Sequence, residues 1–65
     1  MYGNRIKILR IENGITQAEL AKIIDTTAST IGKYEREQLE PNIEIISKLC
    51  NYFNVSADYI LGLED

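Results

Sequence analysis

Residues 16–36, TQAELAKIIDTTASTIGKYER, carry the signals for two short helices and a tight turn between them. Thr16 with Glu19 three residues later forms a capping box, which predicts that a helix begins directly after Thr16. Thr27 is a good N-cap for a second helix, and only residues 25–27 separate the two. Two short helices joined in this way are typical of a helix-turn-helix, which we place at about 17–36.

The rest of the chain is also predicted to be helical, because no stretch alternates apolar and polar residues. A first helix carries Ile6 and Leu9 on one face and is expected to end at Asn13-Gly14. The clearest helical period lies at Ile46, Leu49, Cys50 and Phe53, after the expected cap Asn42, and Ser56 is expected to cap a short last helix that stops at Gly62. The sequence therefore predicts an all-α fold of five helices in a single domain, residues 1–65.

Composition excludes several classes of function. With one cysteine, Cys50, and no histidine, we expect no disulfide, no metal site and no cofactor, and no arrangement of residues supports catalysis. Cys50 itself falls on the apolar stripe, as a small buried residue would. No apolar run approaches the roughly 18 residues that cross a bilayer, and the first residues lack the apolar stretch of a signal peptide. We expect a cytoplasmic protein with no membrane contact.

The net charge of −3 argues against nucleic acid as a partner, but the charge is unevenly distributed. Residues 1–36 hold six basic residues against four acidic ones, a local charge of +2, whereas residues 37–65 hold Lys48 against six acidic residues, a local charge of −5. An anion-binding face is therefore expected in the first half.

Several segments resemble a known family in order and spacing: residues 16–22 (TQAELAK), residues 29–36 (STIGKYER), Pro41 and residues 54–62 (NVSADYILG). They are similar to the Cro/C1-type (XRE) family of phage repressors, and the resemblance covers roughly residues 4–63. It implies a compact, lambda-repressor-like domain that reads double-stranded DNA with its third helix, usually as a dimer on a pseudo-palindromic operator.

The outer face of the third helix is the expected reading face. At 100° per residue, Ala28, Ser29, Gly32, Lys33 and Arg36 fall within about 140° of one another, with the apolar residues of this helix opposite. Because three of these residues are small, the backbone is expected to approach the base edges closely. Lys33 is the main long side chain that can donate a hydrogen bond, either to a guanine or to a phosphate. Ala28 and the Thr30 methyl are suited to an apolar contact with a thymine methyl group.

The resemblance further implies that Gln17 contacts the DNA backbone, and Arg10 and Arg36 are expected to contact phosphates from the rim. The full set of predicted DNA-binding residues is Arg10, Gln17, Thr27, Ala28, Ser29, Thr30, Gly32, Lys33 and Arg36. The chain departs from the family at two positions. Asp25 stands where the turn usually holds glycine, and Ala28 replaces a long polar residue.

A homodimer is expected, because one short recognition helix supplies little specificity alone. Candidate interface residues are Ile8, Ile11, Tyr59 and Leu63, although exposed single apolar residues are also common without any such role.

The predicted function is a sequence-specific DNA-binding transcriptional regulator. The alternative is a protein-interaction module, such as an antitoxin-like partner-binding protein, which the net acidity, the sparse reading face and the extra isoleucines favour.

Overall fold

The computed structural model describes residues 2–63, so residues 1, 64 and 65, the ends of the predicted domain, lie outside the described residues. The elements are α1 (Tyr2–Glu12), α2 (Gln17–Ile23), α3 (Ala28–Glu35), α4 (Ile43–Phe53) and α5 (Ala57–Ile60). Between residues 2 and 63 there is no strand, and the predicted all-α fold of five helices is confirmed.

The side-chain caps predicted from the sequence are present at the helix N-termini. In the capping box of α2 the Thr16 hydroxyl accepts from the Glu19 N–H at 3.0 Å, and the Glu19 carboxylate accepts from the Thr16 N–H at 2.8 Å. The N-caps of α3, α4 and α5 are Thr27, Asn42 and Ser56. These local bonds satisfy N–H groups that have no partner inside a helix, and they fix where each helix begins.

Left-handed residues end several of the helices. Gly14 follows α1 with φ 68°, and Asn54 ends α4 with φ 56°. Asp25, in the turn between α2 and α3, has φ 63°. This left-handed conformation favours glycine, and here an aspartate adopts it. The tight turn thus forms without the family's usual glycine.

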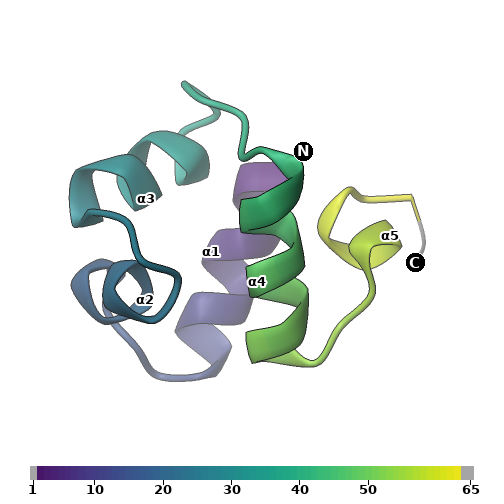
Figure 1. Cartoon of the computed structure of the whole chain (residues 1–65), viewed down its shortest axis with the longest axis horizontal. Coiled ribbons are helices and arrows are strands. Elements are labelled where there is room, and N and C mark those ends of the chain that lie inside the picture. Colours follow the sequence, from purple (N-terminus) through teal and green to yellow (C-terminus); the bar gives the residue numbers. More distant parts are fainter. Residues whose placement is uncertain (1, 64–65) are drawn as a thin grey trace.

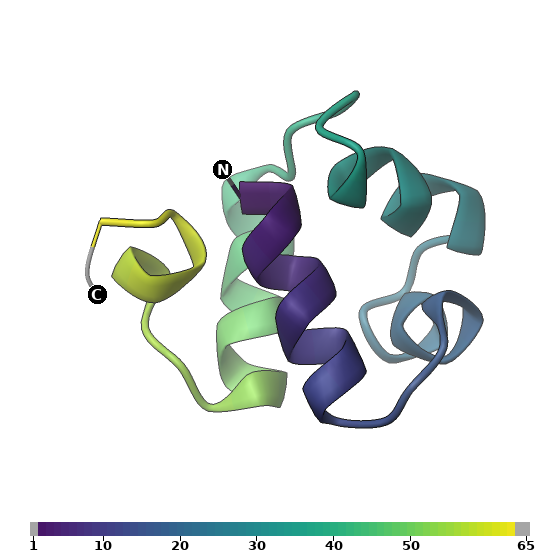
Figure 2. The same ribbon diagram turned by 180° about the vertical axis from the view of Figure 1, so that it is seen from behind.

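The helices surround one core. In Figures 1 and 2, α1 and α4 form the middle of the molecule, with α2 and α3 on one side and α5 on the other. All five helices or their caps contribute buried side chains to a single cluster: Ile6, Leu9, Leu20, Ala21, Ile24, Ile31, Tyr34, Leu49 and Ile60. Because α1 packs against both α3 and α5, it connects the helix-turn-helix to the C-terminal side of the fold.

A glycine sets the distance between α1 and α3. Gly3 is buried, and a Cβ at this position would lie 2.1 Å from the Tyr34 carbonyl oxygen and 3.0 Å from that of Glu35. No side chain fits there, because the obstruction is backbone. The N-terminal turn of α1 therefore holds the C-terminal end of α3 through a contact that only glycine permits.

No helix in residues 2–63 has the length and apolar character needed to cross a membrane.

Candidate nucleic-acid interface

The outer surface of α3 presents small and polar side chains. Ala28, Ser29 and Lys33 are exposed, while Ile31 and Tyr34 are buried beneath them. The orientation predicted from the helical period is therefore confirmed. This face offers two long cations, Lys33 and Arg36, beside the short side chains of Ala28 and Ser29.

Gly32 does not provide the open backbone that the sequence suggested. It is buried, although it lies on the outward side of α3, because the Arg36 guanidinium lies over it. A Cβ built on Gly32 would come 2.9 Å from Arg36 Nη1 and 3.6 Å from Cζ. The side chain of Arg36 points back along the helix, as long side chains do in helices. The space above Gly32 is thus occupied by a cation.

Thr27 and Thr30 use their hydroxyl groups within the helix start. The Thr27 oxygen accepts from the Thr30 N–H at 3.2 Å, and the two hydroxyl oxygens lie 3.0 Å apart. Thr30 is half-buried, which leaves its methyl as the part suited to an apolar contact.

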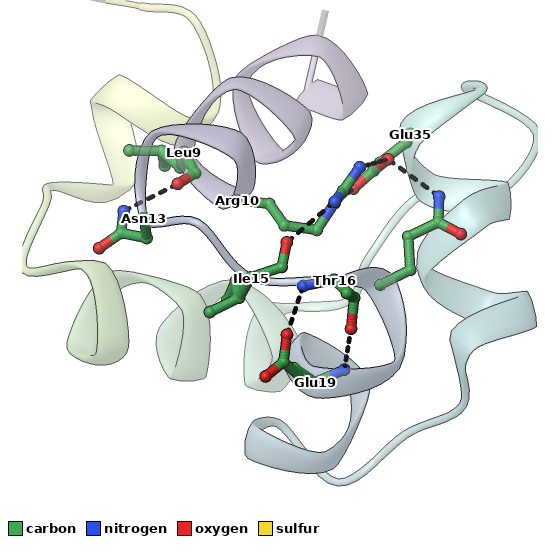
Figure 3. Close-up of polar contacts among 8 residues, drawn as sticks. Leu9, Arg10, Asn13, Ile15, Thr16, Glu19 and Glu35 are labelled. Atoms are coloured by element: carbon green, nitrogen blue, oxygen red, sulfur yellow. Dashed lines mark hydrogen bonds and ion pairs between the residues drawn. The ribbon is translucent and has the colours of Figure 1, made fainter.

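Arg10 is not at the rim, contrary to the expectation that it would contact a phosphate. Its Nε donates to Glu35 Oε2 at 2.6 Å, its Nη2 to Glu35 Oε1 at 3.1 Å and its Nη1 to the Ile15 carbonyl at 3.0 Å (Figure 3). The two side chains are 14% and 4% exposed. The hydrogen bond to Glu35 raises the pKa of the Arg10 guanidinium above its usual value. Arg10 is therefore an internal cation that joins α1 to α3.

Glu35 is the residue that sequence reasoning missed. Besides Arg10, it accepts from Gln17 Nε2 at 3.1 Å through Oε1, so one carboxylate joins α1, α2 and α3. The signal was present, because Glu35 comes four residues after Ile31 and so lies on the core side of α3. Gln17, half-buried at the start of α2, is held next to the recognition helix by this bond.

The cations left at the surface of the helix-turn-helix are few. Lys22, Lys33 and Arg36 are exposed, whereas Arg10 is paired inside and Arg5 lies over the Tyr59 ring, 4.6 Å from its centroid. Lys48 Nζ donates to the Ile24 carbonyl oxygen at 3.5 Å. Because Arg10 and Glu35 neutralise each other, the local charge of +2 is unchanged, but fewer cations are exposed for contact with phosphates.

The residues predicted to form a dimer interface differ in exposure. Ile11 is 58% and Leu63 72% exposed, and Ile8 is also exposed, whereas Tyr59 is half-buried beneath Arg5. Another exposed apolar residue was not expected: Ile43, in the first turn of α4, is 86% exposed. Ile43 stands directly after a loop, where the spacing of apolar residues does not predict whether a side chain is exposed.

A capped helix, a four-residue turn (residues 24–27) with a left-handed residue, and a second helix whose outer face is exposed define a helix-turn-helix protein. The sequence model described as "Helix-turn-helix" matches residues 6–60, and the chain belongs to this family, of Cro/C1 (XRE) type. The resemblance seen in the sequence is therefore confirmed.

Individual relatives agree with this assignment. The chain is 36% identical to the HTH-type transcriptional regulator ImmR of Bacillus subtilis (strain 168), over 97% of this chain and 50% of that protein. It is also 36% identical to antitoxin PezA of Streptococcus pneumoniae, over 95% of this chain and 39% of that protein. The chain spans about half the length of the first curated relatives it matches.

A solved structure matches nearly the whole fold. The P22 c2 repressor protein, crystallised in complex with synthetic operator 9T, superposes with a TM-score of 0.87 at 33% identity, covering 92% of this chain and 91% of that one.

Proposed function

We propose that this chain is a sequence-specific DNA-binding transcriptional regulator of repressor type, which acts in the cytoplasm as a binding protein and not as an enzyme. The observation that carries the proposal is the match of the whole helical arrangement to a repressor solved on operator DNA. The exposed outer face of α3 supports it, because its small residues suit close approach to base edges in the major groove.

Specific roles follow from the geometry. Lys33 is the exposed donor toward a guanine or a phosphate, and Ala28 with the Thr30 methyl suits a thymine methyl. Gln17 gives one amide N–H to Glu35, so its second N–H is available to a phosphate. Because that bond fixes the amide next to α3, Gln17→Ala should weaken binding to all sequences alike.

A homodimer on a pseudo-palindromic operator is part of the proposal. The domain measures 27 × 22 × 20 Å, so two copies reading major grooves about 34–36 Å apart would come close to contact. Ile8, Ile11 and Leu63 are the exposed apolar residues proposed to lie between them, with Tyr59 contributing at the edge. Ile11→Asp should then lower the dimer fraction in analytical ultracentrifugation, whereas Ile23→Asp, also at an exposed isoleucine, should not.

The test is selection of a site from a random duplex library, followed by titration of that site at several salt concentrations. Each protomer has three exposed cations in the helix-turn-helix, six in a dimer, so the slope of log K against log salt should be no steeper than about −5. A scrambled duplex of equal length is the control. Failure to enrich any sequence at low salt would contradict the proposal.

A second candidate, binding of a protein partner in the manner of an antitoxin, is favoured by the similarity to antitoxin PezA and by the exposed Leu39 and Ile43. Glu37, Glu40 and Glu44 surround these two residues in the sequence, which suits a basic, apolar partner better than DNA. An apolar contact of this kind would respond weakly to salt, in contrast to phosphate binding.

A further inference from the structure

The row of α3 residues spaced four apart, Ala28, Gly32 and Arg36, runs from the core-side edge of the outward face toward its middle. Arg36 is the C-cap residue, so its backbone lies at the far end of the helix. Its guanidinium nevertheless lies over Gly32, one turn nearer the helix start. The positive charge therefore lies beside the middle turn of α3 and not at its C-terminal end.

The guanidinium also has a hydrogen-bond partner, which orients it. Arg36 Nε donates to Gln38 Oε1 at 3.2 Å, which favours one orientation of the group. Among the described residues, no hydrogen bond engages Nη1 or Nη2. These two nitrogens form the end of the planar fork that can donate to a pair of acceptors such as O6 and N7 of guanine.

From these contacts we infer that Arg36, seated over Gly32, is a base-reading residue specific for guanine, and not a rim contact to phosphate. The inference rests on the proposed DNA-binding function and names a specificity-determining residue within it. Gly32 has a defined part in this arrangement: any larger residue would displace the guanidinium from its place beside the middle turn of α3. Lys33, 60° further around the helix from Arg36, then contacts phosphate.

Two variants separate base reading from charge and from folding. Arg36→Lys keeps the positive charge but loses the planar fork, so a phosphate contact would survive and a bidentate guanine contact would not. Gly32→Ala puts a Cβ within 2.9 Å of Nη1, and the obstruction is the end of a flexible side chain, so only the guanidinium must move. Since alanine is the better helix former, this variant should unfold at a higher urea concentration than the native protein.

The experiment is selection from a random duplex library with the native chain, Arg36→Lys, Gly32→Ala and Lys33→Ala, followed by titration of the selected site and of copies with each base pair replaced. We expect the native chain to prefer guanine at one position of each half-site by roughly 5- to 150-fold. Arg36→Lys should lose this preference, Gly32→Ala should weaken it, and Lys33→Ala should lower affinity for all copies alike.

Two outcomes would overturn the inference. If Arg36→Lys keeps the same preference at every position, Arg36 does not read a base, while the DNA-binding function stands. If the native chain enriches no sequence, the proposed function fails and the inference fails with it.

Discussion

Removing the Arg10 guanidinium, with Arg10→Met, should destabilise the fold far more than removing an exposed cation. In the native protein the Glu35 carboxylate is 4% exposed and accepts from Arg10 Nε, Arg10 Nη2 and Gln17 Nε2. Without Arg10 only the neutral amide of Gln17 remains of these three donors. Breaking a buried ion pair in this way costs roughly 3–5 kcal/mol, and we expect about 3 kcal/mol because the Arg10 end has some access to water.

That loss is large for a chain of 65 residues, whose total stability is on the order of 3–10 kcal/mol. Urea unfolding followed by far-ultraviolet circular dichroism measures it. With a slope of about 1 kcal/mol/M, the midpoint should fall by roughly 3 M. Lys7→Met, which removes an exposed cation from the same helix, is the matched control and should stay within about 0.5 kcal/mol of the native protein.

The double variant Arg10→Met/Glu35→Leu completes the test. Replacing both partners of a buried pair by apolar residues is often neutral, so most of the lost stability should return and the cycle should give a coupling of at least about 2 kcal/mol. The reasoning is refuted if Arg10→Met costs less than about 1 kcal/mol, as for an ordinary surface ion pair. It is equally refuted if the double variant is no more stable than either single one.

Three further predictions test a packing contact, the strain in a turn and the burial of a thiol. Gly3→Ala should cost about 1–3 kcal/mol by thermal unfolding, because its Cβ would collide with the Tyr34 carbonyl, and an unchanged Tm would disprove that contact. Asp25→Gly should raise the Tm, by up to roughly 8 °C, through relief of φ 63°, whereas Asp25→Ala should not; equal Tm values would remove the strain argument. Burial raises the pKa of the Cys50 thiol, so at pH 8 it should react with a disulfide reagent more slowly than in urea, and equal rates would contradict its burial.

The helix starts and the helix order could be predicted from the sequence because they depend on local chemistry. Thr16, Thr27, Asn42 and Ser56 each bond to an N–H three residues away, which spacing alone reveals. The left-handed conformation of Asp25 agrees with the resemblance, because the family's turn usually holds glycine at this position.

The site could be predicted less completely, because its decisive contacts join residues distant in the chain. Arg10 and Glu35 are 25 residues apart, so although helical spacing places Glu35 on the core side of α3, nothing in the sequence identifies Arg10 as its partner. Gly3 gave no signal, because its role depends on the backbone of α3. The guanidinium over Gly32 was missed for a different reason: a helical projection places Cα atoms, whereas the end of an arginine lies a full turn from its own Cα.

The placement of charged side chains affects how well this protein would discriminate between DNA sequences. Affinity for DNA of any sequence comes mainly from phosphate contacts by Lys and Arg, and here Arg10 is paired internally while Arg5 packs on Tyr59. The acidic residues 37–65 reduce that affinity further. Contacts to base edges from α3 do not depend on net charge in the same way. We therefore expect weak binding to arbitrary DNA, so that even a modest affinity for the operator would give a high specificity ratio, provided that two copies bind together.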